Sequence, residues 1–156
     1  MTKGLNKKTP KIIVVVLGLA VNSKGQFLLT LRNDPTNPRA HNKWEIAGGG
    51  MEFGESPETT CVRELQEEIG VTPEIIYPNP IVVTNTWTNK YQVVLLTYLV
   101  DIGGQEIKLD MDETVDYAWY NLHDALNLDY LPALDKILIA ADKLLRENPD
   151  LGKRIS

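Results

Sequence analysis

Short apolar runs recur along the chain, and their composition predicts mainly strands. The first two runs, residues 12–21 and 27–31, are separated by the turn-like Asn22-Ser23-Lys24-Gly25, which predicts two strands joined by a hairpin. Residues 33–42 hold two prolines and three asparagines and are expected to form a loop. The remaining runs predict four more strands, at residues 44–46, 81–87, 91–100 and 115–120.

Two segments carry the spacing and end signals of helices instead. Ser56 suits an N-cap, Pro57 suits the first helical position, and Gly70 suits the end of the same helix. Residues 131–145 place apolar side chains three and four positions apart, which predicts a second helix. A chain of 156 residues is the size of one ordinary domain, so we expect a single domain over residues 1–156.

Charge and cysteine content indicate which partners and which cellular compartment suit the chain. The chain has 16 basic and 21 acidic side chains and a formal net charge of -5. Binding of duplex nucleic acid needs clustered Lys and Arg, so we expect no duplex partner, and a polyanionic substrate would need a cation as mediator. The single Cys61 cannot form an internal disulfide, which suits a reducing compartment and leads us to expect a cytoplasmic location.

The N-terminus offers one alternative to a first strand. Four basic residues precede the run 12–21, as in a secretory signal: Lys3, Lys7, Lys8 and Lys11. The run lacks a small-x-small cleavage site, and it is far shorter than the ~20 residues that span a bilayer. We therefore expect a strand here and no association with a membrane.

The helix that begins near residue 57 concentrates acidic side chains. At about 100° per residue, Leu65 and Ile69 fall close to Val62 and form the expected buried stripe. Opposite this stripe three carboxylates converge within one turn: Glu64, Glu67 and Glu68. Like charges at this spacing weaken a helix by a few tenths of a kcal/mol per pair. The cluster is either a solvated acidic face or a site for a divalent cation such as Mg²⁺, and a bound cation would relieve that repulsion.

The same segment, with the glycines that precede it, resembles the complete Nudix box over residues 49–71. The matching positions are Gly49, Glu55, Arg63, Glu64, Leu65, Glu67, Glu68, Gly70 and Val71. The resemblance implies an α/β fold of the Nudix type, an α/β/α sandwich with a mixed β-sheet between helices. It also implies hydrolysis of a nucleoside diphosphate linked to another moiety, with Mg²⁺ or Mn²⁺ as cofactor.

The resemblance also implies roles for individual residues. Glu67 and Glu68 match the principal metal ligands, and Glu64 matches a third carboxylate that acts as ligand or base. Gly48 would lend its carbonyl oxygen to the metal.

Four further box residues are implied to be supports. Arg63 matches the arginine that orients the acidic cluster, and Glu55 matches the acid that pins the loop to the helix. Gly49 and Gly70 fill the fixed glycine positions at the two ends.

The general base is left open between the box and a later loop. Glu113 lies where the later acid of the family is often found, before the strand that holds Trp119, and it would act as base or as a further metal ligand. The alternative candidates for the base are Asp112, Asp116 and Glu64. Glu113 could also be a residue of a solvated turn with no part in catalysis.

The sequence says less about which nucleobase the substrate carries. Residues 44–49, Trp-Glu-Ile-Ala-Gly-Gly, resemble the Trp-Glu-Phe-Pro-Gly-Gly lead-in of enzymes that remove oxidised or unusual nucleoside triphosphates. Ala47 replaces the proline, a substitution also seen in relatives that act on pyrimidine nucleotides. Oxidised-guanine enzymes read the base with an asparagine near the start of their last helix, where this chain has Leu134. Asp135 could read a base instead.

Other candidate contacts with substrate carry two interpretations each. Trp87 could stack on a base or pack in the core. Arg32, Arg39 and His41 could contact phosphates or lie in a solvated loop, and Tyr130 is equally ambiguous.

The expected function is a nucleoside triphosphate or deoxynucleoside triphosphate pyrophosphohydrolase that releases a monophosphate and pyrophosphate. The alternatives are an ADP-ribose or dinucleoside polyphosphate hydrolase and a noncatalytic Nudix module that senses a nucleotide. A homodimer is a further expectation, because dimers are common in the family, although no segment identifies an interface.

Overall fold

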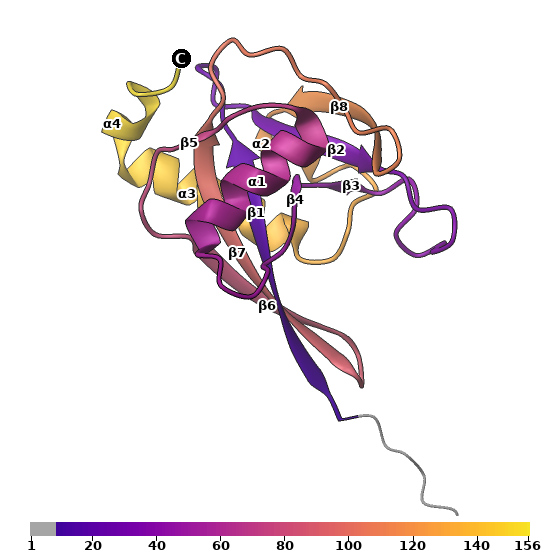
Figure 1. The fold of residues 1–156 in the computed structure, drawn as a ribbon. Helices are drawn as coiled ribbons and strands as arrows, with labels where there is room; N and C mark the ends of the chain where they lie inside the picture. Colours follow the sequence, from indigo (N-terminus) through magenta and orange to yellow (C-terminus); the bar gives the residue numbers. More distant parts are fainter. Residues whose placement is uncertain (1–8) are drawn as a thin grey trace, which may run out of the picture.

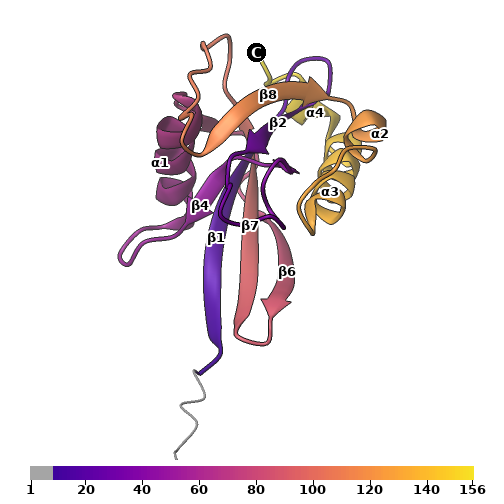
Figure 2. The same cartoon turned by 90° about the vertical axis from the view of Figure 1, so that its right-hand side faces the viewer.

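Helices cover both faces of a central β-sheet in the computed structural model, which describes residues 9–156 (Figures 1 and 2). The strands are β1 (Lys11–Ala20), β2 (Phe27–Arg32), β3 (Trp44–Glu45), β4 (Gly48–Gly50), β5 (Glu74–Ile75), β6 (Ile81–Thr88), β7 (Tyr91–Asp101) and β8 (Thr114–Tyr120). The helices are α1 (Pro57–Ile69), α2 (Leu122–Ala125), α3 (Leu134–Glu147) and α4 (Pro149–Gly152). Lys3, Lys7 and Lys8, the basic residues weighed as part of a signal, lie outside the described residues.

The strands form a larger mixed sheet and a smaller antiparallel one. The larger sheet has the order β4-β1-β7-β5, and β6 also pairs with β7. In it β1 and β7 run parallel, whereas the other pairs are antiparallel. The smaller sheet has the order β3-β2-β8. Figure 2 shows α1 on one side of the larger sheet and α3 on the other, so the expected α/β sandwich with a mixed sheet is confirmed.

The predicted hairpin between the first two strands is wrong. β1 and β2 belong to different sheets and share only an isolated bridge between Val21 and Phe27. β1 pairs with β4 along Val15–Leu17 on one edge and with β7 along its whole length on the other, whereas β2 pairs with β3 and β8. The tight turn after β1 therefore carries the chain from one sheet to the other.

The last long helix begins later than its apolar spacing predicts. Pro132 precedes Ala133, whose φ of 78° is left-handed, and α3 starts only at Leu134. The short elements β4, β5, α2 and α4 carry too few residues to show a period, and the sequence did not predict them. Among the described helices, none combines the length and apolar character needed to cross a bilayer.

Two apolar clusters hold the layers together. One lies between the sheets and α3 and includes Leu29, Leu99 and Ile137, and the other lies under α1 and includes Val16 and Leu65. The first residues of β1 and the tip of the hairpin β6–β7 pair with one another and extend beyond the helices as an arm (Figure 1).

Candidate functional site

The glycines of β4 allow helix α1 to lie very close to the sheet. A β-carbon added to Gly49 would lie 2.5 Å from the Glu64 carboxyl carbon, and one added to Gly48 would meet the Val16 carbonyl oxygen. Gly48 also has a φ of 152°, which residues other than glycine rarely adopt. Gly49 therefore brings the strand backbone directly against the acidic side of the helix, and Gly48 brings it against β1.

Helix α1 begins and ends as the sequence predicts. The Ser56 hydroxyl accepts a hydrogen bond from the Thr59 N–H at 3.1 Å, and Pro57 follows at the first helical position. Gly70 caps the other end with a φ of 70°, and its N–H donates to the carbonyl oxygens of Gln66 and Leu65. Both ends are thus determined by local interactions.

The buried face of α1 differs from the helical-wheel prediction. Cys61, Leu65 and Ile69 are fully buried, but Val62 is only half-buried. Glu68 is 4% exposed, so it does not share an open face with Glu67. The close approach of β4 and of the chain around residues 110–114 covers Glu68, and neither approach is visible in the helix sequence.

Arg63 joins the loop before the helix to two box carboxylates. Its guanidinium donates to the Glu55 carboxylate at 2.6 and 3.0 Å, to Glu64 at 2.8 Å and to Glu67 at 3.2 Å, and also to the Gly50 carbonyl oxygen. Arginine hydrogen bonds lower the pKa of Glu55 to about 2. Arg63 and Glu55 thus lie where the supporting roles need them.

Glu68 is held by neutral donors. The Gly48 N–H donates to Oε2 at 2.9 Å, and the Thr114 hydroxyl donates to Oε1 at 3.1 Å. Burial raises the pKa of Glu68 to about 8, and the nearby carboxylates Glu45 and Glu113 add to this rise. A buried carboxylate with acidic neighbours is a position where a metal ion would be favourable.

A polar cavity of about 280 Å³ opens over Glu68. Its walls are Arg32, Asn33, Asp34, Glu45, Gly48, Glu68 and Glu113. The structure therefore brings Glu113 to Glu68, across 45 positions of sequence, and of the four base candidates it is the only one that lines this cavity. Glu64 and Glu67 instead face Arg63, and Asp112 and Asp116, which are exposed like Glu113, are not among the residues that line it.

The carboxylates fit a divalent cation in chemistry, although they are not gathered around one point. Within residues 9–156, no three His, Cys, Asp or Glu side chains converge closely enough to hold a metal ion as they stand. Glu68 and Glu113 face one cavity, and Glu64 and Glu67 are drawn toward Arg63. Oxygen donors of this kind suit Mg²⁺ or Mn²⁺.

Arg32 stands between two acidic side chains at the cavity wall. It pairs with Asp34 at 3.1 Å and with Glu45 at 3.3 Å. Burial raises the pKa of Glu45 to about 7, although Arg32 opposes that rise. In the sequence Glu45 stands out only by its place on a short predicted strand directly before the glycines, and no role was expected for it.

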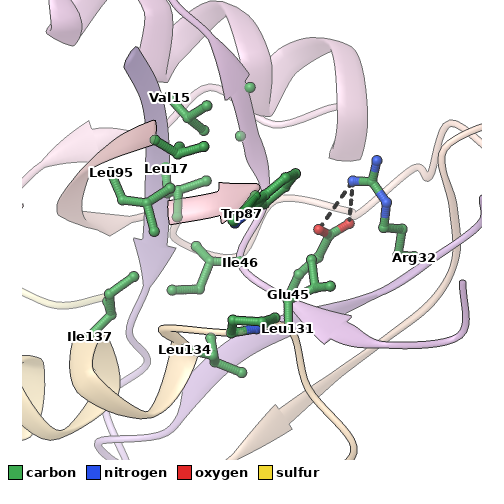
Figure 3. A pocket seen from close by; sticks show the side chains of 14 residues that line it. Val15, Leu17, Arg32, Glu45, Ile46, Trp87, Leu95, Leu131, Leu134 and Ile137 are labelled. Atoms are coloured by element: carbon green, nitrogen blue, oxygen red, sulfur yellow. Dashed lines mark hydrogen bonds and ion pairs between the residues drawn. The ribbon is translucent and has the colours of Figure 1, made fainter. Parts of the chain in front are cut away.

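An apolar cavity of about 240 Å³ adjoins the polar one, and both are lined by Arg32, Glu45 and Gly48. In Figure 3, Val15, Leu17, Ile46 and Leu95 lie on one side of the apolar cavity and the Arg32–Glu45 pair on the other, with Trp87 between them. Trp87 is 53% exposed, so the interpretation that it packs in the core is wrong.

The remaining candidates for contact with substrate differ in which cavity, if any, they line. Arg39 lines a third, outer cavity of about 420 Å³, which shares Trp87, Leu131 and Pro132 with the apolar one. Leu134 lines the apolar cavity, whereas Asp135, next to it in the first turn of α3, lines none of the three. His41 accepts a hydrogen bond from the Asp34 N–H at 3.0 Å.

Thr114 was not among the residues expected at the site, because a lone threonine carries no signal in the sequence.

Comparison with known proteins decides the family. The family model described as the NUDIX domain matches residues 11–141, which is most of the chain. The chain belongs to the Nudix family. Its box, residues 49–71, forms β4, the following loop and α1.

Individual Nudix relatives resemble this chain over parts of their length. The 8-oxo-dGTP diphosphatase of Escherichia coli (strain K12) is 39% identical over 64 residues, which are 41% of this chain and 48% of that protein. The ADP-ribose pyrophosphatase of Bacillus subtilis (strain 168) is 31% identical over 111 residues, 70% of this chain and 59% of that protein. The chain thus spans about half the length of these relatives. The crystal structure of a MutT protein from Methanosarcina mazei Go1 is similar with a TM-score of 0.72 and 26% identity, covering 90% of this chain and 97% of that one.

Proposed function

We propose that this protein is a metal-dependent Nudix hydrolase that cleaves a nucleoside triphosphate or deoxynucleoside triphosphate into a monophosphate and pyrophosphate. The observation that carries the proposal is the pair of adjoining cavities, one polar and lined by Glu68 and Glu113, the other apolar and lined by Trp87. A nucleotide has the same division, with a charged phosphate end and a flat, largely apolar base. The diphosphatase and pyrophosphatase relatives support the same reaction class.

The phosphate end of the substrate would lie at the carboxylates. We propose that Glu64, Glu67 and Glu68, with the Gly48 carbonyl oxygen, hold Mg²⁺ or Mn²⁺. When bound, such ions neutralise phosphate charge and lower the pKa of a coordinated water. Glu113 lies at the same cavity as Glu68 and would accept the proton of the attacking water.

The rest of the substrate would follow the shared wall toward the apolar cavity. Arg32 lies where the two cavities meet and would contact a phosphate oxygen in place of one of its present carboxylate partners. Trp87 and the aliphatic side chains opposite it would hold the base. Leu134, at this wall, offers no hydrogen bond to a base edge, and Asp135 would need to turn from its present position to do so.

The outer cavity favours a second candidate function. Because it continues the apolar cavity past Trp87 toward Arg39, it leaves room for a moiety larger than a single base. A substrate such as ADP-ribose or a dinucleoside polyphosphate would use that room. A noncatalytic nucleotide-sensing module has less support, because such modules usually lose box carboxylates and this chain keeps all of them.

A substrate screen tests these candidates directly. The purified protein would be incubated with the four deoxynucleoside triphosphates, 8-oxo-dGTP, ADP-ribose and a dinucleoside tetraphosphate, each with Mg²⁺ or Mn²⁺. We expect release of pyrophosphate and a monophosphate from at least one triphosphate. We also expect Glu67→Gln and Glu68→Gln to lower kcat by about 100-fold or more with the fold retained, since each removes a charged ligand from the metal site.

The outcomes separate the candidates. Release of two monophosphates from ADP-ribose, with triphosphates untouched, would favour the second function. Binding of a nucleotide without cleavage of any substrate would favour the sensing module. Variants as active as the parent at saturating Mg²⁺ would reject the assigned metal ligands.

A further inference from the structure

The side chain of Thr114 contacts the buried Glu68 carboxylate. Its hydroxyl donates to Glu68 Oε1 at 3.1 Å, and within residues 9–156 no other side chain donates to this carboxylate. Thr114 is fully buried and Glu68 is 4% exposed, so water does not substitute easily for the hydroxyl. The second oxygen, Oε2, is held by the backbone N–H of Gly48. Each oxygen of the carboxylate therefore accepts a hydrogen bond from a donor that is distant in sequence.

An irregularity in the smaller sheet aims Thr114 at this carboxylate. Along β2 and β8 the register runs Leu31↔Asp116 and then shifts, so that Arg32 lies opposite Thr114. Without the shift Val115 would lie opposite Arg32, on the face of the sheet that carries the polar cavity. Extra residues of this kind often re-aim a side chain next to a functional site. Here the extra residue puts a hydroxyl where a valine would otherwise lie.

The segment before Thr114 is also tied to the end of helix α1. The N–H groups of Lys108 and Asp110 donate to the carbonyl oxygens of Ile69 and Glu68, each at 2.9 Å. These carbonyls belong to the last turn of the helix and have no partner within it. The Thr114 backbone is thus fixed relative to the helix that carries Glu68, and its hydroxyl has a fixed direction of approach.

We propose that Thr114 is a positioning residue that holds the Glu68 carboxylate in the orientation required to bind the divalent cation. The proposal rests on the proposed function of Glu68 as a metal ligand. Groups that orient a metal ligand in this way typically contribute about 10- to 100-fold to metal affinity or activity.

Two substitutions isolate the hydroxyl. Thr114→Val keeps the shape of the side chain and removes the donor, whereas Thr114→Ser keeps the donor and removes a methyl group. Thr97 provides a matched control, because it is also a fully buried strand threonine and its hydroxyl has no hydrogen-bond partner. Thr97→Val therefore removes a buried hydroxyl that orients nothing. If Thr114→Val does not fold, Thr114→Ala removes the same donor with a smaller side chain.

The measurements are the dissociation constant for Mn²⁺, from the paramagnetic resonance signal of free Mn²⁺, together with kcat, KM and the melting temperature. We expect Thr114→Val to weaken Mn²⁺ binding and lower kcat by about 10- to 100-fold. The KM for nucleotide should stay close to that of the parent, because Thr114 does not line the apolar cavity. Thr114→Ser should keep both values close to those of the parent, and Thr97→Val should match the parent in Mn²⁺ binding, kcat and KM.

The failures are distinguishable. A parent protein that binds Mn²⁺ and cleaves a nucleotide, with Thr114→Val equal to it in both respects, would overturn the role of Thr114 alone. Equal losses in Thr97→Val and Thr114→Val would also overturn it, because the effect would then be one of packing. A parent protein that neither binds Mn²⁺ nor cleaves any nucleotide would overturn the proposed function and this inference with it.

Discussion

At the scale of single residues, the three box glutamates share a helix but not an environment. Glu64 and Glu67 accept hydrogen bonds from Arg63, whereas Glu68 is buried and accepts them from the neutral donors Gly48 and Thr114. Burying a carboxylate without a cation costs free energy, and its neighbours Glu45 and Glu113 increase that cost. Glu68 therefore destabilises the metal-free fold when it is ionised.

This cost predicts a pH-dependent effect of Glu68→Gln. The pKa of Glu68 is raised from 4.5 to about 8 in the folded protein, so the folded state binds its proton more tightly than the unfolded state. The stability associated with the protonated group is complete below pH 4.5 and is lost as the pH rises through about 8. In the metal-free protein, Glu68→Gln should therefore raise the melting temperature more at about pH 9 than at about pH 5.

Thermal unfolding in the presence of a chelator measures this difference. Glu67→Gln serves as the control, because the Glu67 side chain is 60% exposed and a replacement there removes no buried charge. A difference between Glu68→Gln and the parent that is the same at both pH values would contradict a buried, ionising Glu68.

At the scale of elements, the spacing between β4 and α1 decides where the box carboxylates lie. Glycine at position 49 leaves room for the Glu64 carboxylate directly against the strand, and Glu64 in turn pairs with Arg63 at 2.8 Å. Gly50, the next residue, has open space where a β-carbon would lie. Two adjacent glycines thus differ sharply in what an added methyl group would displace.

We therefore expect Gly49→Ala to impair catalysis without unfolding the protein. The new methyl group would displace the flexible end of the Glu64 side chain rather than backbone, so the melting temperature should change little. Misplacing a group at the metal site should lower kcat by about tenfold or more. Steady-state kinetics of Gly49→Ala and the control Gly50→Ala would check this, and equal losses in the two variants would contradict it.

At the scale of the whole molecule, the apolar cavity is assembled from elements that are far apart in sequence. Strands β1 and β7 supply Val15 and Leu95, the arm supplies Trp87 from β6, and α3 supplies Ile137. Trp87 is exposed on the arm yet lines both the apolar and the outer cavity. The arm therefore contributes a wall of the proposed substrate site.

Trp87→Ala should weaken substrate binding while leaving the metal site intact. Loss of base stacking on an aromatic side chain costs about 1–3 kcal/mol, so the KM for nucleotide should rise by about 5- to 150-fold. Tyr91→Ala is the matched control, because Tyr91 is an exposed aromatic residue of the same arm that lines none of the three cavities. An unchanged KM in Trp87→Ala, or an equal rise in Tyr91→Ala, would contradict stacking on Trp87.

The sequence by itself determined the features that depend on neighbouring residues. Helix α1 begins at Ser56 and ends at Gly70 because caps act within one turn, and the spacing of the box glutamates follows from the helical period. The main strands were also predictable, since each is rich in β-branched, aromatic and other apolar residues. The same local pattern carried the resemblance to the Nudix family.

Only the tertiary structure decided which segments meet. The hairpin expected between the first two strands does not form, because β2 pairs with β3 and β8 in the smaller sheet while β1 pairs with β4 and β7 in the larger one. Glu68 is buried by β4 and by the chain around Thr114, which lie far from its helix in sequence. Glu113 lines the same cavity as Glu68 because the loop that carries it is hydrogen-bonded to the end of that helix. A one-residue shift between β2 and β8 turns Thr114 toward Glu68. Burial and long-range hydrogen bonds arise from packing between distant segments, and no local pattern in the sequence encodes them.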